Sequence, residues 1–308
     1  MDKEVLYLDR FLHIIINQQS RNSDATFKKL LLELPNYTND YKIHITDNVF
    51  QLEQLIKELK EMITEDQLVV IVGGDGSLNQ TVTLFEKYNL KNDIGYIPAG
   101  SGNDFARTHG IPIKTEKAIA HLFQVKKASE LSILHATQGE HVQFAVNSLG
   151  IGLDGLINEM LNSNNHKKLL GPTSYIASIL AAFIKQKKFK ITIKVDQGIY
   201  TFNQVQMALV ANNPYFGGGI EIVPEADVRD DFLEVVIANG VTTSNLMNIL
   251  PRVFINKSHL LHPKLHFFKT KKVAIFTESE QFAQKDGEIF KQKGFAYTFS
   301  TKKRSFWV

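Results

Sequence analysis

The amino-acid sequence predicts an α/β protein in which a doubly wound α/β domain is followed by a mainly β domain. Along the first third of the chain, short apolar runs that are typical of buried strands alternate with segments of helical periodicity. From about Ser129 the pattern changes to closely spaced strand-like runs separated by polar turns. We therefore expect an α/β domain over residues 1–128 and a β-rich, sandwich-like domain over residues 129–308.

Length and composition are those of a folded protein with ordinary hydrophobic cores. The chain has 308 residues, of which 44% are hydrophobic and 22% are charged. It has no cysteine, which excludes disulfides and thiolate metal sites and fits a reducing compartment. A net charge of +3 is too balanced to require a nucleic acid partner. The first ten residues lack a signal-peptide pattern, and no apolar run reaches the ~18 residues that span a bilayer.

The first domain is expected to contain a parallel sheet. A strand pattern followed by helical apolar spacing (i, i+3, i+4, i+7) occurs three times, and a fourth strand pattern follows. The expected strands are Phe11–Asn17, Tyr41–Thr46, Leu68–Val72 and Asp93–Gly100, and helices are expected over residues 27–34, 52–63 and 78–85. A sheet of this kind binds its ligands beyond the carboxyl ends of its strands.

The second domain is expected to be built mainly from strands. Its strand-like runs are Leu131–Thr137, Val142–Ser148, Phe189–Val195, Ile199–Asn212, Phe232–Ala238 and Lys271–Thr277. Helical stretches interrupt them near Ser174–Lys187 and Asn245–Phe254. The last run, Phe295–Ser300, either closes this domain or returns to the first sheet, and the sequence leaves both open.

Three glycines surround a single aspartate where the third strand ends. Without Cβ atoms, Gly73, Gly74 and Gly76 allow backbone N–H groups to approach a phosphate chain. The helix that begins near Ser77 adds the positive end of its dipole. Asp75 would repel phosphates unless a divalent cation such as Mg²⁺ lies between them. The alternative is a tight turn that carries a surface aspartate.

The loop after the fourth strand also has small and acidic residues. Ile97–Arg107 offers Ser101, Asn103 and Asp104 after the strand pattern ends. Loops at neighbouring strand ends converge in a doubly wound sheet, so Asp75 and Asp104 are expected to face one nucleotide–metal centre.

These two segments together resemble the diacylglycerol kinase family, which includes sphingosine kinases and bacterial lipid kinases. They read GGDGSLNQTV (Gly73–Val82) and PAGSGNDFAR (Pro98–Arg107). The resemblance continues in the family's order through Asn147–Gly155, Lys167–Ser178, Asn212–Ile237 and Lys285–Phe290, so it covers nearly the whole chain. The bacterial diacylglycerol kinases are the most similar branch.

The resemblance implies a nucleotide-binding domain, a lipid-binding domain and an active site in the cleft between them. The implied reaction is ATP- and Mg²⁺-dependent phosphorylation of a lipid hydroxyl, with diacylglycerol, converted to phosphatidic acid in phospholipid biosynthesis, as the first expectation. The implied nucleotide-binding residues are Asn17, Gln18, Gln19, Ser20, Arg21, Thr46, Gly73, Gly74, Asp75, Gly76, Ser77, Leu78, Asn79, Gln80, Ser101 and Asn103. Gln18 and Arg21 replace the family's usual proline and glycine, and Ser77 replaces a threonine.

The resemblance also implies catalytic and metal-binding residues. Asp286 matches the family's general base, with Glu288 beside it, and the choice between the two stays open. The nucleotide metal would be held at Asp75 and Asp104. A second, structural Mg²⁺ is implied at Asp227, Asp230 and the Phe232 carbonyl, although Asp231 stands where the family usually has glycine.

Two other patterns favour structural explanations. Gly150–Gly155 matches G-x-G-x-x-G, but no acidic residue follows about 20 positions later, so a tight turn lining the interdomain cleft is favoured over dinucleotide binding. His259, His262 and His266 have no nearby acidic partner, which favours a solvated loop over a metal site. The P-loop pattern is absent.

Basic clusters suggest a membrane surface as a partner. Lys185–Val195, Lys269–Val273 and Thr301–Val308 are either solvated faces or surfaces that dock on anionic lipid. Phe306 and Trp307 either insert at that interface or pack in a core. We expect a cytoplasmic protein at the inner face of the membrane that binds no nucleic acid, and a homodimer is left open.

Two other functions remain as alternatives. One is a kinase for a soluble hydroxyl substrate, similar to an NAD kinase, and the other is a lipid-binding protein without catalysis. The presence of Asp75, Asp104 and Asp286 favours the enzyme.

Overall fold

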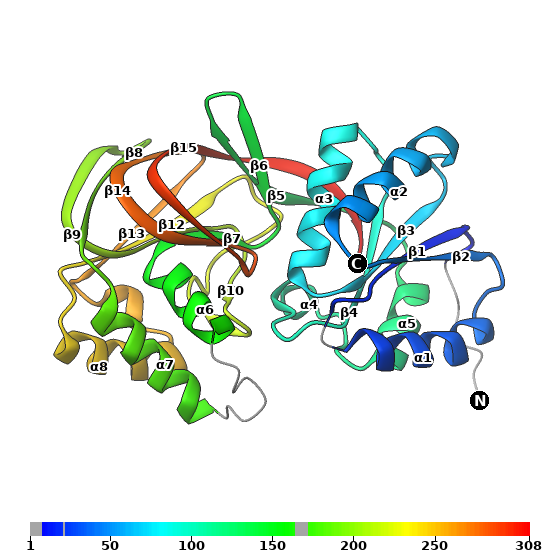
Figure 1. Cartoon of the computed structure of the whole chain (residues 1–308), viewed down its shortest axis with the longest axis horizontal. Coiled ribbons are helices and arrows are strands. Elements are labelled where there is room, and N and C mark those ends of the chain that lie inside the picture. Colours follow the sequence, from blue (N-terminus) through cyan, green and yellow to red (C-terminus); the bar gives the residue numbers. More distant parts are fainter. Residues whose placement is uncertain (1–7, 21, 164–171) are drawn as a thin grey trace. The chain divides into compact units, whose positions relative to one another are not determined.

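A computed structural model describes residues 8–20, 22–163 and 172–308 (Figure 1). Contacts between Cα atoms divide the chain into two compact units. Unit 1 comprises Met1–Ser132, Gly217–Gly219 and Lys303–Val308, and unit 2 comprises Ile133–Phe216 and Ile220–Lys302. The predicted order, an α/β part followed by a mainly β part, is confirmed.

Unit 1 contains a parallel sheet with a buried centre. Strands β1 (Leu12–Asn17), β2 (Tyr41–Thr46), β3 (Leu68–Gly73) and β4 (Ile94–Pro98) lie in the order β4-β3-β1-β2. Every residue of β3 and β4 is buried, as expected of central strands covered on both faces. All four strands point their carboxyl ends to the same edge.

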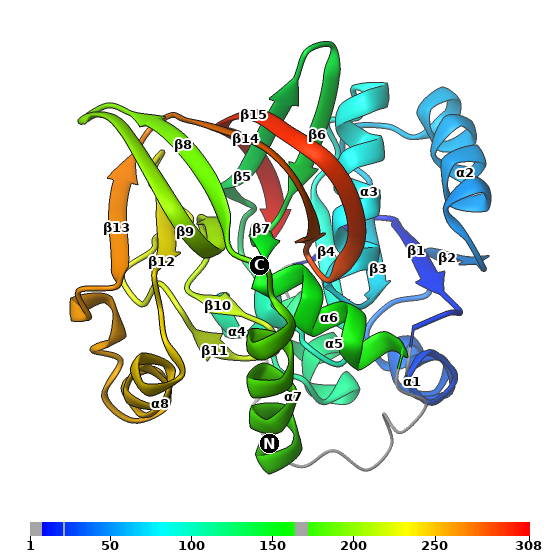
Figure 2. The ribbon, with the colours of Figure 1, turned by 60° about the vertical axis from the view of Figure 1, so that its left-hand side comes forward.

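Helices cover the two faces of this sheet. α1 (Ser23–Glu33) packs with α5 (Thr115–Gln124) on one face, and α2 (Val49–Met62) packs with α3 (Asp75–Tyr88) on the other (Figures 1 and 2). The short helix α4 (Asp104–Thr108) follows β4, and a 3₁₀ turn, η1 (Leu34–Asn36), follows α1. α2 begins where the Asn48 side chain accepts a hydrogen bond from Gln51 N at 3.0 Å.

The end of the chain adds a fifth strand to this sheet. β15 (Glu288–Trp307) pairs in parallel with β4 through Phe306 and Trp307. Phe306 is fully buried, and the Trp307 indole donates a hydrogen bond to Leu122 O at 2.9 Å. Of the alternatives that the sequence left open, the chain therefore returns to the first sheet, and its last aromatic residues pack in a core.

Unit 2 is an antiparallel sheet that curves around an apolar core. Its long strands β9 (Gly198–Ala211) and β14 (Val273–Lys285) both pair with β7 (Ser148–Gly152) at one end and with β8 (Phe189–Val195) at the other. The remaining strands are β5 (Ser129–Gln138), β6 (His141–Ala145), β10 (Tyr215–Phe216), β11 (Ile220–Glu221), β12 (Leu233–Asn239) and β13 (Leu265–Thr270). β8 alternates buried and exposed residues, which leaves its lysines at the surface.

Three helices lie on one side of the unit 2 strands. They are α6 (Leu153–Ser163), α7 (Pro172–Lys185) and α8 (Thr243–Pro251), which continues into a π-helical turn, η3 (Arg252–Asn256), before the 3₁₀ turn η4 (His259–Leu261) (Figures 1 and 2). α7 and α8 agree with the predicted helical stretches. α6 was not predicted.

The tight turn predicted at Gly150–Gly155 is wrong. The segment is a junction between β7 and α6, and its glycines make room for close packing inside unit 2. A Cβ atom on Gly150 would lie 1.8 Å from Asp154 Oδ2, and one on Gly155 would lie 2.5 Å from Ala283 N. The glycines therefore serve strand–helix packing.

The solvated loop predicted for the three histidines is also wrong in part. His259 is fully buried with Nε2 at 2.8 Å from Ile222 O, and His262 is also buried. The reason is that the His259 ring contacts the backbone of Ile222, a residue far from it in the sequence. Among residues 8–20, 22–163 and 172–308, no group of three or more His, Cys, Asp or Glu side chains is arranged to hold a metal ion.

Within the described part of the chain, no helix combines the length and apolar character that crossing a bilayer requires.

A histidine pair on the first two strands makes stability depend on pH. His13 Nδ1 lies 3.1 Å from His44 Nε2, and burial, followed by His13 and Lys42, lowers the pKa of His44 to about 4. The unfolded chain, with a pKa of 6.5, takes up the proton first. The free energy of unfolding should therefore fall as the pH drops from about 6.5 towards 4. Urea midpoints at pH 7 and 5 would measure this.

The matched control is His141, which lies at an exposed strand position. His44→Gln should flatten the pH dependence, whereas His141→Gln should leave it as in the wild type. An unchanged slope in His44→Gln would contradict this explanation.

Candidate active site

The loops after β3 and β4 lie against each other through their backbones. Ala99 N donates to Gly73 O at 2.7 Å. A Cβ atom on Gly100 would lie 2.5 Å from the Gly74 Cα, and one on Gly74 would lie 3.2 Å from the Gly100 Cα. Glycine at position 100 is therefore required for this approach, and a Cβ at position 74 would be tolerated only if the neighbouring backbone moved away.

Asn103 braces the second loop from inside. It has a left-handed backbone (φ 54°), and its amide accepts a hydrogen bond from Gly100 N and donates to Gly100 O, both at 3.1 Å. The buried Tyr96 hydroxyl donates to Gly73 O at 3.0 Å. One asparagine and one tyrosine thus tie the two loops into a single unit.

Asp75 and Asp104 are brought together, as the sequence predicted. The Asp75 carboxylate accepts hydrogen bonds from Asp104 N at 3.2 Å and Phe105 N at 3.1 Å. Asp104 Oδ2 accepts one from Gly218 N at 3.0 Å, while its Oδ1 is buried without a hydrogen-bond partner. Burial, followed by the negative charge of Asp75, raises the pKa of Asp104 to about 6.

Two neighbouring carboxylates with one unsatisfied buried oxygen fit a divalent cation. Oxygen ligands of this type are the ones that Mg²⁺ prefers, and a cation would relieve the repulsion that raises the pKa of Asp104. Metal binding by these residues stays a prediction.

The loop after β1 joins the same cluster through Ser77. Asn17 Nδ2 donates to Ser77 Oγ at 2.8 Å, and Ser20 Oγ lies 3.4 Å from the same oxygen. A Cβ atom on Gly73 would lie 2.6 Å from Ser77 Oγ, so the glycine leaves room for the hydroxyl. Arg21, a predicted nucleotide-binding residue, lies outside the described residues.

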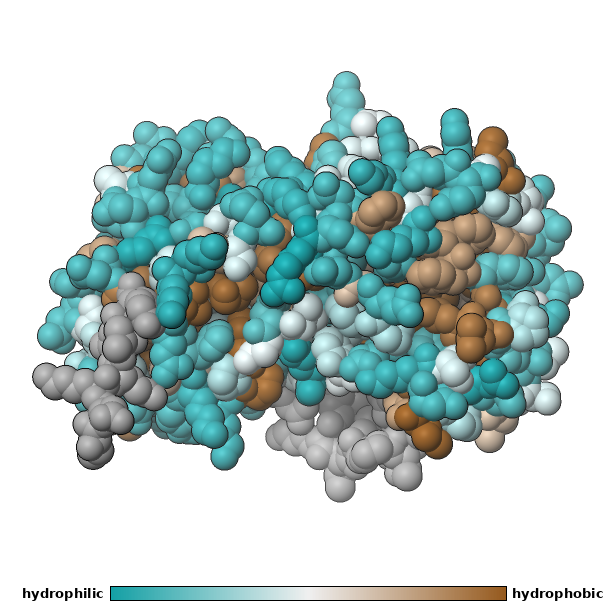
Figure 3. Space-filling model, turned by 180° about the vertical axis from the view of Figure 1, so that it is seen from behind, coloured by the Kyte–Doolittle hydropathy of each residue, from teal (hydrophilic) through white to brown (hydrophobic). Residues whose placement is uncertain are grey.

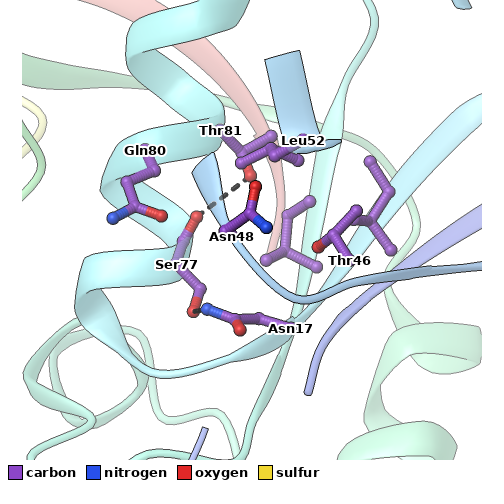
Figure 4. Close-up of a pocket in the computed structure, with 9 residues that line it drawn as sticks. Asn17, Thr46, Asn48, Leu52, Ser77, Gln80 and Thr81 are labelled. Atoms are coloured by element: carbon purple, nitrogen blue, oxygen red, sulfur yellow. Dashed lines mark hydrogen bonds between the residues drawn. The ribbon is translucent and has the colours of Figure 1, made fainter. Parts of the chain in front are cut away.

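A pocket opens beside these residues at the carboxyl end of the sheet (Figure 4). In Figure 4, polar side chains from β1, β2, α3 and the N-cap residue of α2 surround one space, and a hydrogen bond of 3.0 Å runs from Thr81 Oγ1 to Ser77 O. Its lining comprises Ile15, Asn17, Thr46, Asn48, Leu52, Ile71, Ser77, Gln80 and Thr81.

Sequence reasoning found only part of this lining. Thr46 and Gln80 were predicted, whereas Asn48 and Thr81 were missed. An asparagine directly before a helix at a strand end was the signal for Asn48. Leu78 and Asn79 were predicted to bind nucleotide, but both are fully buried.

The predicted base, Asp286, lies in a hairpin turn of unit 2. Asp286 and Gly287 link β14 to β15 with φ values of 47° and 86°, the Asp-Gly turn that two-residue hairpins prefer. The carboxylate accepts hydrogen bonds from Val146 N (2.6 Å), Asn147 N (2.9 Å) and Ser148 N (3.0 Å).

These three donors hold the Asp286 carboxylate in one position. A carboxylate held in this way serves either as a catalytic base or only to stabilise the turn. Glu288, the alternative base, is more exposed, and its carboxylate lies 3.9 Å from Lys285 Nζ. The choice between the two stays a prediction.

A lysine forms an ion pair with one of the acidic residues in the loop expected to hold a second metal. Asp227 and Asp230 each accept a hydrogen bond of 2.9 Å from the backbone two residues later. Lys269 Nζ lies 3.1 Å from Asp230 Oδ2 and 3.3 Å from Glu234 Oε1. An ammonium group therefore already stands beside Asp230 and Glu234, at the position where a cation would contact Asp230. A metal at Asp227, Asp230 and the Phe232 carbonyl stays a prediction without structural support.

Unit 2 also contains an apolar cavity of about 110 Å³, which the sequence did not indicate. Its walls come from α6, α7, α8, η3 and strands β9 and β12. The polar residues among its lining are Gln206 and His259. Gln206 bonds the Val241 backbone in both directions, and His259 bonds Ile222 O, so the cavity presents hydrocarbon almost alone.

Comparisons with known proteins agree with this two-part organisation. The family model of the diacylglycerol kinase catalytic domain matches residues 12–135, and that of the YegS C-terminal NAD kinase beta sandwich-like domain matches residues 147–299. The relative "Putative lipid kinase YtlR" of Bacillus subtilis (strain 168) is 25% identical over 87% of this chain and 89% of its own length. "Putative lipid kinase SAS0691" of Staphylococcus aureus (strain MSSA476) is 23% identical, over 87% of each chain.

A solved structure has the same fold. It is the crystal structure of a protein described as a putative diacylglycerol kinase from Bacillus anthracis str. Sterne, with a TM-score of 0.75 and 20% identity, covering 96% of this chain and 97% of that chain. With its catalytic-domain match, its β sandwich-like match and relatives that are named putative lipid kinases, this chain is a kinase that belongs to the diacylglycerol kinase family.

Proposed function

We propose that the enzyme transfers the γ-phosphoryl group of ATP, with Mg²⁺, to the hydroxyl of diacylglycerol and so forms phosphatidic acid. The observation that carries the phosphoryl-transfer step is the joined pair of strand-end loops, which places Asp75 beside Asp104 at the start of α3. Phosphoryl transfer depends mainly on positioning and charge neutralisation, which such a site supplies.

The phosphates of ATP would bind where α3 begins. The backbone N–H groups of Gly74–Ser77 belong to the N-cap and first turn of that helix, where the helix dipole favours anions. The side chains of Asn17, Ser20 and Ser77 add polar groups at the same edge. The nucleoside would then lie against the edge of the sheet that Thr46 and Asn48 form, because the pocket between them, at about 10 Å³, is too small to enclose it.

Mg²⁺ would be held by Asp75 and Asp104. When bound there it would neutralise the phosphate charge, while the Asp75 carboxylate stays oriented by the N–H groups of Asp104 and Phe105.

The acceptor hydroxyl needs a proton acceptor. In the proposed step the lipid oxygen forms a bond to the γ-phosphorus as the bond from that phosphorus to the β–γ bridging oxygen breaks. The hydroxyl proton passes to a carboxylate, Asp286 in our assignment and Glu288 in the alternative. Three backbone donors position Asp286 for such a role.

The apolar cavity of unit 2 supports a lipid as the acceptor. An acyl chain transfers favourably into hydrocarbon walls, whereas a sugar or nucleotide would leave its polar groups without partners there. The second candidate, a soluble hydroxyl substrate, is favoured only by the name of the matched C-terminal domain, which refers to NAD kinase.

Removing the charge of Asp75 should abolish most turnover. Asp75→Asn keeps an oxygen for the α4 amides but halves the carboxylate charge of the site, so we expect kcat to fall ~10²-fold or more and Mg²⁺·ATP to bind more weakly. Asp40→Asn, an exposed change at the opposite end of β2, should behave as the wild type. Steady-state kinetics and calorimetric ATP binding would measure both, and a folded Asp75→Asn enzyme with normal kinetics would refute the site.

The Asp286→Asn variant should distinguish a catalytic base from a carboxylate with a structural role only. As a base, its loss should lower kcat ~10²–10⁴-fold while ATP affinity stays nearly unchanged. If the role of Asp286 is only structural, the substitution should mainly lower the thermal midpoint. The asparagine amide has a single acceptor oxygen and cannot accept the hydrogen bonds that the two carboxylate oxygens accept. Glu288→Gln is the matched comparison: loss of kcat there, with Asp286→Asn active, would show that Glu288 is the base.

Lipid acceptance should depend on the size of the cavity. Transfer of ³²P from ATP to a panel of diacylglycerols, other lipid alcohols and NAD would identify the acceptor class. Leu250→Trp narrows the cavity, so kcat/KM for long-chain diacylglycerol should fall roughly tenfold and that for short chains should change less. Leu260→Trp, partly buried nearby but outside the lining, is the control. Transfer of ³²P to NAD and to none of the lipids would favour the alternative function, a kinase for a soluble substrate.

A further inference from the structure

Several large apolar side chains of unit 2 are exposed next to the walls of its cavity. Hydrophobic residues reach the protein surface in patches between hydrophilic ones on the face shown in Figure 3. Around the cavity the exposed fractions are 76% for Ile184, 57% for Met247, 46% for Phe254, 80% for Ile255 and 81% for Leu261. We call these five residues the apolar rim.

Each rim residue lies beside the cavity lining in the chain. Phe254 is itself one of the lining residues, so the same side chain both lines the cavity and is exposed at the surface. Ile184 follows the lining residue Phe183, Met247 follows Leu246, and Leu261 lies two residues after His259. Single exposed apolar residues are common, but several of them on the segments that wall an apolar cavity indicate a binding surface.

The segments that carry the rim are uniformly basic. Val241–Thr277 contains Arg252, Lys257, Lys264, Lys269, Lys271 and Lys272 and no aspartate or glutamate. Leu180–Val195 contains five lysines and likewise no acidic residue. Lys257 and Lys269 form ion pairs with acidic residues from other segments, and the exposed Lys187 and Lys188 stand close to Ile184 in sequence.

We propose that unit 2 docks on an anionic bilayer through the apolar rim, with Ile255 and Leu261 entering the boundary between headgroups and acyl chains. A bilayer is the partner that offers both required features, a negative surface and a hydrocarbon layer directly beneath it. Bound in this way, the cavity would receive its lipid from the membrane. This last step rests on the proposed function, whereas the docking does not.

Vesicle binding without turnover tests the docking alone. The full chain would be sedimented with vesicles of phosphatidylcholine, with and without phosphatidylglycerol, in the absence of ATP and diacylglycerol. The wild type should bind the anionic vesicles. The double variant Ile255→Glu/Leu261→Glu should bind them with an affinity that is lower by roughly tenfold or more. Lys187→Gln/Lys188→Gln should weaken binding at low salt only.

Two equally exposed apolar residues elsewhere provide controls. Ile199→Glu in unit 2 and Leu32→Glu in unit 1 replace side chains that are 67% and 75% exposed, and both should keep vesicle binding within about twofold of the wild type. Equal losses in these controls, wild-type binding by the double variant, or no vesicle binding by the wild type would each overturn the proposal.

A second copy of the chain is the competing occupant of the rim. Light scattering that shows a dimer converted to monomer by Ile255→Glu/Leu261→Glu, with vesicle binding unchanged, would assign the rim to self-association and overturn the proposal. Phosphorylation of a soluble short-chain diacylglycerol should be unaffected in the double variant. Failure of that assay in the wild type would count against the proposed function and leave the docking result standing.

Discussion

The contact between two glycine backbones, Gly74 and Gly100, is the constraint on which the rest of the unit 1 site depends. The strand-end loops can approach this closely only without a side chain at position 100. This approach lets the Asp75 carboxylate reach the first amides of α4, and it leaves Asp104 buried beside a second negative charge. A charged pair held by rigid backbone is what a cation and a phosphate chain need.

In unit 2, close packing at glycines positions a helix on the sheet. Gly150 and Gly155 let α6 lie directly on β7 and β14, and the Asp286 carboxylate joins the β14–β15 turn to the chain before β7. The helices on that side of the sheet do not fill the space beneath them, and an apolar cavity remains. A kinase that acts on a lipid needs such a hydrocarbon site in addition to a polar one, because the two parts of its acceptor have opposite solvation.

Local patterns predicted much of the fold. Period-two and helical spacing gave β1, β2, β3, β4, α7 and α8 close to their observed bounds, because the apolar residues of each element recur at the period of that element. α6 was missed because three glycines and an aspartate resemble a turn, while the packing against Ala283 that requires Gly155 is formed by a distant strand. His259 was misjudged for the same reason, since its burial depends on Ile222.

The sequence by itself determined the family, the two-part order and the pairing of Asp75 with Asp104, because glycines, carboxylates and strand ends recur at short, fixed spacing. Only the tertiary structure decided the roles that depend on distant partners. It returned Phe306 and Trp307 to the first sheet, placed Lys269 beside Asp230, and assembled the cavity and the apolar rim from separate helices and strands. Spacing along a chain encodes local geometry, whereas burial and charge compensation are set by residues far apart in sequence, which only folding brings into contact.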